Sequence, residues 1–168
     1  KTTFLIEDGL TGIVGPNGCG KSNIVESLRW CMGESSAKSM RGSGMEDVIF
    51  SGTSNRPSKN ISNVSILLDN KANEGPSQYN NSEEVLVKRK IERDKGSKYY
   101  INNKEVRARD VQTLFADLST GAHSPSLISQ GRIGQLVTAK PIERRSVLEE
   151  AAGISGIHAR RQEAETRL

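Results

Sequence analysis

The sequence predicts an α/β fold that begins with a strand, a glycine-rich loop and a helix, continues as a mixed or antiparallel β meander, and ends in helices. Three observations lead to this prediction. Glycines gather in residues 12–20, between an apolar run and a helical stripe. Apolar residues alternate with polar ones around residues 64–68 and 85–91. The spacing of apolar residues is helical again in the last third of the chain.

The opening unit contains two apolar runs, residues 4–6 and 10–14, which are predicted to be short strands. After the glycine-rich loop, apolar residues recur every three or four positions, which predicts a helix with one buried stripe. The members of this stripe are Ile24, Val25, Leu28, Cys31 and Met32. Gly33 is expected to end the helix, since glycine suits the position after a helix C-terminus.

The middle of the chain predicts antiparallel strands. Val64, Ile66 and Leu68 would share one face of a first strand. The polar stretch NKANEGPSQYNNSEE predicts a hairpin connection, after which Val85, Val87 and Ile91 resume the period of two. The segment SKYYIN is expected to pair with that strand. A further short strand is predicted at residues 48–50.

The last third predicts a short helix over residues 111–118 and a longer one with Pro141 in its first turn and Thr138 as its cap. The longer helix carries Val147, Leu148, Ala151 and Ala152 and continues into HARRQEAETRL, which has few large apolar residues. Such a polar helix buries little surface. It is therefore expected either to project from the domain or to be cut short.

Composition excludes several classes of protein. No apolar run is long enough to cross a membrane, and aromatic residues make up only 4% of the 168 residues, too few for base-stacking platforms. Two cysteines, Cys19 and Cys31, lack a Cys or His at metal-ligand spacing, which predicts reduced thiols. The net charge is +4, and residues 81–110 hold nine Lys and Arg against six Asp and Glu. That segment is either a polyanion-binding surface or a solvated basic face.

The glycine-rich loop matches the phosphate-binding pattern G-x-x-x-x-G-K-[ST]. Glycines let backbone N–H groups converge on phosphate oxygens, and the helix start adds unpaired donors. Lys21 would reach the β- and γ-phosphates, and the Ser22 hydroxyl would bind Mg²⁺. The sequence therefore predicts binding of ATP with Mg²⁺. The residues expected at the nucleotide are Gly15, Pro16, Asn17, Gly18, Cys19, Gly20, Lys21, Ser22 and Asn23.

Two other features resemble parts of an ATPase but are predicted to be unrelated. Asp69 ends the apolar run ILLD, where a metal-binding carboxylate could stand, but Asn70 follows instead of an acidic base. Asp69 is therefore interpreted as the end of a meander strand. The segment LSTG at residues 118–121 lacks the second glycine of a Leu-Ser-Gly-Gly signature.

Four separated motifs occur in the order typical of one family. They are GPNGCGKSNIVESLRWCMGESSAKSMRGSGMEDVIFSGTSNR, YYINNKEVRARDV, SLISQGRIGQLV and ERRSVLEEAAGI. Together they resemble the N-terminal half of the head of a bacterial SMC (structural maintenance of chromosomes) protein. The resemblance implies an ABC-type P-loop ATPase half-domain. Residues 1–140 would form the N-terminal lobe, and residues 141–168 the helix at the root of an outgoing coiled-coil arm.

The resemblance also assigns roles outside the loop. Arg41 matches the R-loop arginine near the nucleotide phosphates, and Gln130 matches the Q-loop glutamine that approaches Mg²⁺ and the attacking water. Lys21, Arg41 and Gln130 are the expected catalytic residues, and Ser22 and Gln130 the expected metal ligands. Basic residues after INN would meet the DNA backbone without strong sequence specificity, each contact adding about 0.9 to the salt dependence of binding. They are Lys104, Arg107 and Arg109.

The chain departs from a complete ATPase of this family. The Walker B Asp-Glu, the signature motif and the switch histidine belong to the C-terminal half of the head, and neither His123 nor His158 matches the switch position. The lobe alone is therefore expected to be inactive or nearly so.

The resemblance implies a set of partners and a location. The partners are the chain's own C-terminal head half, a second SMC chain in a homodimer, a kleisin with its accessory protein, and duplex DNA. The implied location is cytoplasmic and nucleoid-associated, with no membrane. Two alternatives stay open: a non-catalytic, ATP-gated DNA-binding module, and the head lobe of a related ABC-type DNA-repair ATPase.

Overall fold

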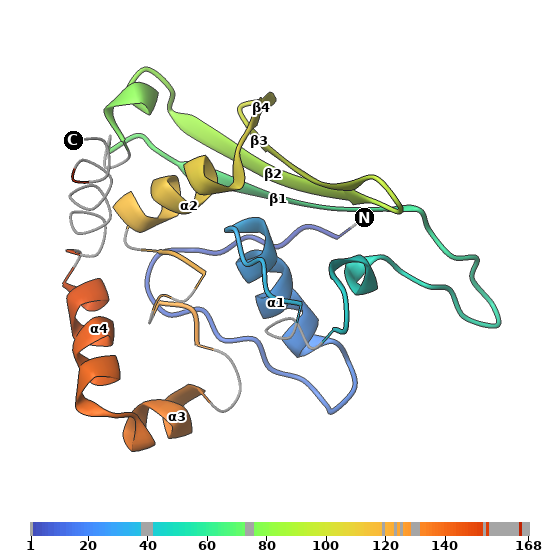
Figure 1. Ribbon diagram of the computed structural model, residues 1–168, viewed down its shortest axis with the longest axis horizontal. Helices are drawn as coiled ribbons and strands as arrows, with labels where there is room; N and C mark the ends of the chain where they lie inside the picture. The colour runs from blue at the N-terminus through green and yellow to red at the C-terminus, as the bar shows by residue number, and fades with distance from the viewer. Residues whose placement is uncertain are drawn as a thin grey trace.

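A computed structural model of the chain describes residues 2–37, 42–72, 76–118, 120–122, 124, 126–128, 132–152, 154 and 165. Figure 1 shows two layers, a twisted sheet and two helices that pack against one of its faces. The sheet contains β1 (Ile61–Asp69), β2 (Glu84–Glu92), β3 (Gly96–Ile101) and β4 (Lys104–Val106). The helices against it are α1 (Lys21–Cys31) and α2 (Ala108–Asp117). The predicted α/β fold is therefore confirmed.

The four strands form an antiparallel meander in the order β1-β2-β3-β4. Val64, Arg89 and Tyr99 lie opposite one another in one row across three strands. Burial alternates along β2 so that every second residue faces the helices. The predicted face of Val64, Ile66 and Leu68 is confirmed, since these residues pack against the core while their neighbours on β1 are exposed.

The turn between β3 and β4 explains why the chain reverses there. Asn102 and Asn103 both adopt left-handed backbone conformations, with φ of 47° and 64°. Two consecutive residues of this kind match the twist of a tight hairpin, and asparagine tolerates the conformation better than most residues. The Asn102 side chain also accepts a hydrogen bond of 2.8 Å from the Leu86 N–H. The turn is thereby tied to β2.

Helix α1 ends in a Schellman motif at the expected glycine. The Gly33 N–H donates to the Trp30 carbonyl and the Glu34 N–H to the Arg29 carbonyl, while Gly33 has φ of 106°. Helix α2 begins three residues earlier than predicted, because the Asp110 carboxylate accepts the Arg107 N–H at 2.9 Å and caps the first turn. Both helices contribute to one buried cluster with the sheet. Its members are Cys31, Val85, Val87, Tyr99, Ile101, Val111, Leu114 and Phe115.

Three predicted strands are wrong. Residues 4–6 and 10–14 have no strand structure and are exposed, with Leu10 at 97% and Val14 at 92%. An isolated extended segment is not stable, because its backbone groups need a neighbouring strand. Residues 48–50 are not a strand either. The 3-10 helix η2 (Met45–Val48) precedes Ile49, which is buried in a second cluster with Trp30 and Ile91.

The C-terminal part contains two helices that lie away from the sheet, α3 (Arg132–Thr138) and α4 (Pro141–Ala151) (Figure 1). Pro141 stands in the first turn of α4, as predicted. The predicted Thr138 cap is wrong, because the Thr138 hydroxyl donates to the Gly134 carbonyl within α3. The Glu143 carboxylate accepts the Lys140 N–H instead, at 3.0 Å. Helix α3 and the 3-10 helix η3 (Ser77–Tyr79) were not predicted.

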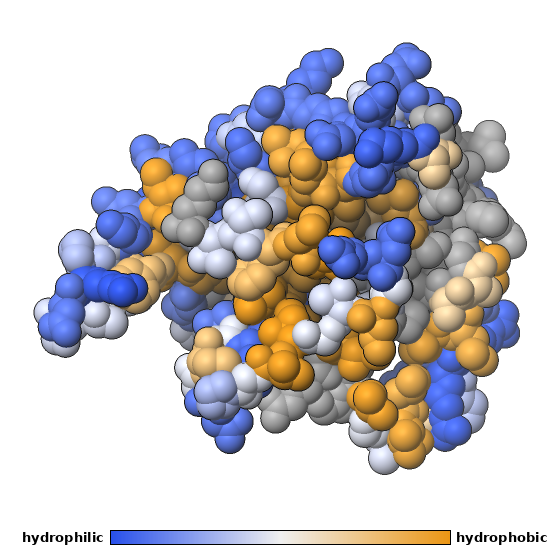
Figure 2. All heavy atoms as spheres, turned by 180° about the vertical axis from the view of Figure 1, so that it is seen from behind, coloured by the Kyte–Doolittle hydropathy of each residue, from blue (hydrophilic) through white to orange (hydrophobic). Residues whose placement is uncertain are grey.

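Large hydrophobic side chains lie exposed on the molecule, and Figure 2 shows orange surface across the centre and the lower part of one face. Exposed side chains of this kind come from the N-terminal segment, α3 and α4, including Leu5, Leu10, Val14, Val137, Ile142 and Leu148. Among the described helices, none is both long and apolar enough to span a bilayer. Exposed apolar surface of this extent marks an interaction site in soluble domains.

Candidate nucleotide site

The glycine-rich loop lies at the free end of α1. Figure 1 shows that the N-terminal end of this helix points away from the sheet, whereas its C-terminal end reaches the sheet. Residues 2–19 are exposed, while Trp30 and Cys31 at the other end are 1% and 0% exposed. The helix thus presents its unpaired N–H groups to solvent, as an anion-binding helix start must.

The loop backbone takes the conformations that only glycine adopts without strain. Gly18 has φ of 80°, and Gly20, the residue before α1, has φ of 90°. A Cβ at Gly15 would lie 2.9 Å from the Cys19 sulfur and close to the Lys21 side chain. A side chain at Gly15 would therefore collide with the Cys19 side chain of the same loop.

The Lys21 side chain folds back onto the loop. Its Nζ donates to the Gly15 carbonyl at 2.6 Å and to the Pro16 carbonyl at 2.5 Å. The Cys19 sulfur lies 3.9 Å from the same nitrogen. These partners are neutral, so an anionic oxygen next to the loop would bind the ammonium more strongly than they do.

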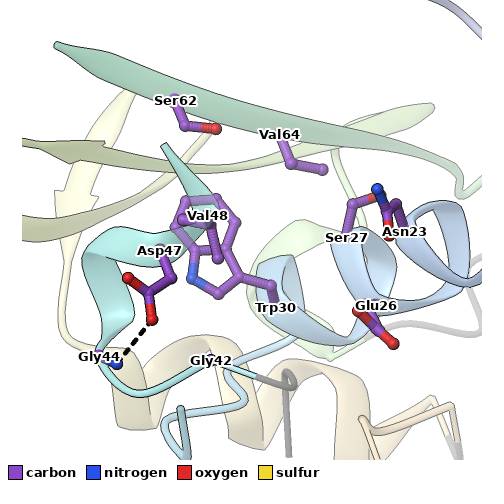
Figure 3. A pocket seen from close by; sticks show the side chains of 10 residues that line it. All are labelled: Asn23, Glu26, Ser27, Trp30, Gly42, Gly44, Asp47, Val48, Ser62 and Val64. Carbon is purple, nitrogen blue, oxygen red and sulfur yellow. Dashed lines mark hydrogen bonds between the residues drawn. The ribbon is translucent and has the colours of Figure 1, made fainter. Parts of the chain in front are cut away.

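A pocket of about 250 Å³ opens on the flank of α1, between this helix, the η2 segment and β1 (Figure 3). Asn23, the last residue predicted at the nucleotide, lines this pocket together with Trp30. The Trp30 indole N–H is buried and has no hydrogen-bond partner among the described residues. Across the pocket, the Gly44 and Ser43 N–H groups and the Ser43 hydroxyl donate to the Asp47 carboxylate, which lowers its pKa.

The other predicted site residues belong to β4 and the start of α2 or lie outside the described part of the chain. Arg41, Gln130 and the two histidines fall on residues that the structure does not describe. Lys104 lies in β4, Arg107 directly precedes α2, and Arg109 lies in the first turn of α2. Arg107 and Arg109 therefore do not share one face of a strand.

Asp69 lies at the end of a meander strand, as the sequence indicated. It ends β1, is exposed, and accepts a hydrogen bond of 3.0 Å from the Lys71 N–H, which lowers its pKa. Asn70 is buried and structural, since its amide donates to the Tyr79 and Ser82 carbonyls at 2.9 and 2.8 Å. Among the described residues no group of three His, Cys, Asp or Glu side chains could hold a metal ion. Leu118 is the C-terminal cap of α2, and Ser119 lies outside the described residues.

Arg89 is the residue that the sequence analysis missed. It is only 3% exposed, and its guanidinium lies between the Trp30 ring at 4.4 Å and the Tyr99 ring at 4.6 Å. Burial lowers its pKa. The signal was in the alternation, because residue 89 falls on the buried face shared by Val85, Val87 and Ile91. An arginine in that register needs partners inside the protein.

Comparison with known proteins fixes the family. Residues 1–131 match the family described as RecF/RecN/SMC N terminal domain. The chain belongs to this family. Chromosome partition protein Smc of Rhodopseudomonas palustris is 58% identical over 167 residues, and Smc of Cereibacter sphaeroides is 57% identical. Each match covers 99% of this chain but 14% of the relative, so the chain spans a small part of the length of these SMC proteins.

Solved SMC heads share the fold. One structure, described under ATP-driven dimerization and DNA-stimulated activation of SMC ATPases, has a TM-score of 0.73 at 29% identity and covers 87% of this chain and 86% of its own. An Smc head bound to the C-terminal winged-helix domain of ScpA has a TM-score of 0.75 at 28% identity, over 83% of this chain and 42% of its own. The chain is thus the N-terminal portion of an SMC head.

Proposed function

We propose that this SMC chain binds ATP at the loop of residues 15–23 and supplies the phosphate-binding half of an ATPase that acts on chromosomal DNA. The observation that carries the proposal is the loop geometry. Gly18 and Gly20 adopt left-handed backbone conformations just before α1, and the Lys21 ammonium lies against the Gly15 carbonyl of the same loop. Identity of 57–58% to chromosome partition proteins supports the cellular role.

The residues present fit a bound nucleotide. A phosphate bound by the loop would accept from the N–H groups at the start of α1 and would replace the two carbonyls that now bind Lys21. The Ser22 hydroxyl, with Gln130, would hold Mg²⁺. When bound, the ion neutralises charge on the β- and γ-phosphates. Arg41 would add a fork of donors toward the phosphates.

The chain would depend on other segments for turnover. A base and a signature motif would come from the C-terminal half of the head and from a second SMC chain in a homodimer. We also propose duplex DNA as the partner of Lys104, Arg107 and Arg109, and a kleisin with its accessory protein as partners of the whole. The kleisin partner is supported by the ScpA-bound Smc head among the structural neighbours. Residues 1–140 would form the lobe and 141–168 the coiled-coil root, in a cytoplasmic, nucleoid-associated protein.

The test is steady-state ATP hydrolysis by this chain, alone and mixed with the C-terminal half of the same SMC head. We expect turnover only in the mixture, and we expect Lys21→Ala to lower it by about 100-fold or more, since the lysine contacts transferring phosphate. Asp69→Ala is the matched control and should leave turnover unchanged. Turnover by the chain alone that disappears in Asp69→Ala would contradict the proposal.

A mixture that binds DNA in response to ATP but does not hydrolyse it would favour the alternative of an ATP-gated binding module. In that case Lys21→Ala would still abolish the ATP response, while substitution of Gln130 would have no effect.

A further inference from the structure

The end of α1 farthest from the phosphate loop is held by side chains from two other elements. The Gln112 amide of α2 donates to the Gly33 carbonyl at 2.8 Å. Arg89 of β2 donates through Nη1 to the Trp30 carbonyl at 2.7 Å and to the Glu34 carbonyl at 2.6 Å. The Trp30 carbonyl belongs to the last turn of α1, and the Gly33 and Glu34 carbonyls follow directly after it, so all three contacts act on the C-terminal end of the helix. The position of α1 is therefore set at this end.

The Arg89 side chain has partners on several sides, where β2, β3 and the end of α1 meet. Its Nε donates to the Ser97 hydroxyl of β3 at 2.8 Å, and the aromatic rings of Trp30 and Tyr99 lie within 4.6 Å of the guanidinium. A cation at a helix C-terminus is also favoured by the helix dipole. One planar group thus joins β2, β3 and the last turn of α1. A lysine ammonium could not bond two carbonyls and the Ser97 hydroxyl while stacking between two rings.

The phosphate-loop end of the helix follows an exposed segment of the chain. Residues 2–19 are exposed, and the Lys21 ammonium bonds carbonyls of its own loop. The helix has 11 residues and is about 16 Å long, so it transmits a shift at one end to the other as a rigid rod. A shift of about 1 Å at a phosphate-binding group is enough to lose much of its interaction.

We propose that Arg89 is a positioning residue for nucleotide binding, which holds the C-terminal turn of α1 so that the loop at the other end presents its N–H groups correctly to phosphate. The inference rests on the proposed function. Arg89 lies at the end of α1 opposite the loop. It does not touch the nucleotide and acts through the helix.

The test is the KM for Mg·ATP and the kcat of the intact SMC protein that contains this chain. Arg89→Met keeps the length and apolar stem of the side chain but removes the guanidinium. Leu114→Ala is the matched control, since Leu114 is 2% exposed in the cluster between α2 and the sheet and its truncation destabilises the same domain. Loss of folded protein lowers the apparent kcat but leaves KM unchanged.

We expect Arg89→Met to raise the KM about 10-fold or more, because the misplaced loop binds phosphate less well. Leu114→Ala should lower only the apparent kcat. Arg89→Lys should fall between Arg89→Met and the unchanged protein. An unchanged KM in Arg89→Met, or an equal rise in Leu114→Ala, would overturn the inference.

Two further sets of variants complete the experiment. Should Arg89→Met fail to fold, Arg89→Lys and Ser97→Ala replace it. A raised KM in both is expected, and an unchanged KM in both refutes the positioning role. Lys21→Ala separates this inference from the proposed function. If the unchanged protein shows no Lys21-dependent ATP binding, the proposed function itself fails, whereas a normal Lys21 effect with no Arg89 effect removes the positioning role alone.

Discussion

Cys19 and Cys31 differ in chemistry because they lie at opposite ends of one helix. Cys19 is exposed in the phosphate loop, beside the Lys21 ammonium. Cys31 is buried, with its sulfur 3.5 Å from the Val64 carbonyl, and burial raises the pKa of its thiol from 9.0 to about 12. The predicted reduced thiols are consistent with both positions, and Cys31 behaves as a small core residue.

The raised pKa of Cys31 gives a pH dependence of stability with a definite sign. The folded state favours the neutral thiol, so this contribution is fully present below pH 9 and is lost as the pH rises from 9 toward 12. Between pH 9 and 10.5 the loss amounts to about 2 kcal/mol, at 1.4 kcal/mol per pH unit.

Urea denaturation at pH 8.5 and 10.5 measures this change. The free energy of unfolding should fall less in Cys31→Ala than in the unchanged protein, because the alanine has no thiol to ionise. Cys19→Ala is the control and should keep the full pH dependence. An equal fall in all three proteins would show that the buried thiol contributes nothing to it.

At the scale of the elements, prediction from sequence succeeded where the residues themselves carry the pattern. The alternation in β1 and β2 and the glycine after α1 fix local structure without help from other parts of the chain. The strands predicted at residues 4–6 and 10–14 failed, since a strand requires a partner strand that sequence patterns do not provide. Arg89 was counted as surface charge, although its register on β2 places it in the core.

The backbone conformation of the glycine-rich loop could be predicted for a similar reason, while its binding of phosphate stays a prediction. Its glycines and Lys21 act through backbone geometry within eight residues, and the structure shows that geometry. The contacts that hold α1 come from residues 89 and 112, far along the chain, and only the fold brings them together. The alternation on β2 marks residue 89 as buried, but it does not show which distant groups the side chain contacts.

The turn at Gly33 after α1 is expected to contribute to the stability of the protein. Gly33→Ala should destabilise the protein by about 1–3 kcal/mol, because alanine is strained at φ of 106° and its Cβ would lie 2.5 Å from the Gln112 side chain. Urea denaturation of the two proteins measures the difference. Gly134→Ala in α3 is the control. Among the described residues, nothing beyond the helix's own backbone lies within 4 Å of a Cβ at that position, and alanine favours a helix, so the control should gain about 0.5–1 kcal/mol. A neutral Gly33→Ala would mean that the turn relaxes without cost.

At the scale of the whole molecule, one part of the described chain encloses a hydrophobic core and another part leaves its apolar side chains exposed. The meander, α1 and α2 enclose a core, whereas residues 2–19, α3 and α4 expose large hydrophobic side chains, including Phe4, Leu10 and Leu136. The family match and the exposed apolar segments have one explanation in common. The rest of an SMC head would supply neighbouring strands for residues 4–6 and 10–14 and would cover their side chains.

Hydrogen–deuterium exchange of this chain, alone and with the C-terminal part of the same SMC head, tests that explanation. Amides of residues 4–6 and 10–14 should exchange rapidly in the chain alone, because no strand protects them, and about 100-fold or more slowly in the complex. Amides of β2 between two neighbouring strands are the control and should be protected in both samples. If the complex forms but residues 10–14 stay unprotected, then the phosphate loop is not anchored by a strand. Its position would then depend on α1 alone, and the contribution of Arg89 to nucleotide binding should be larger.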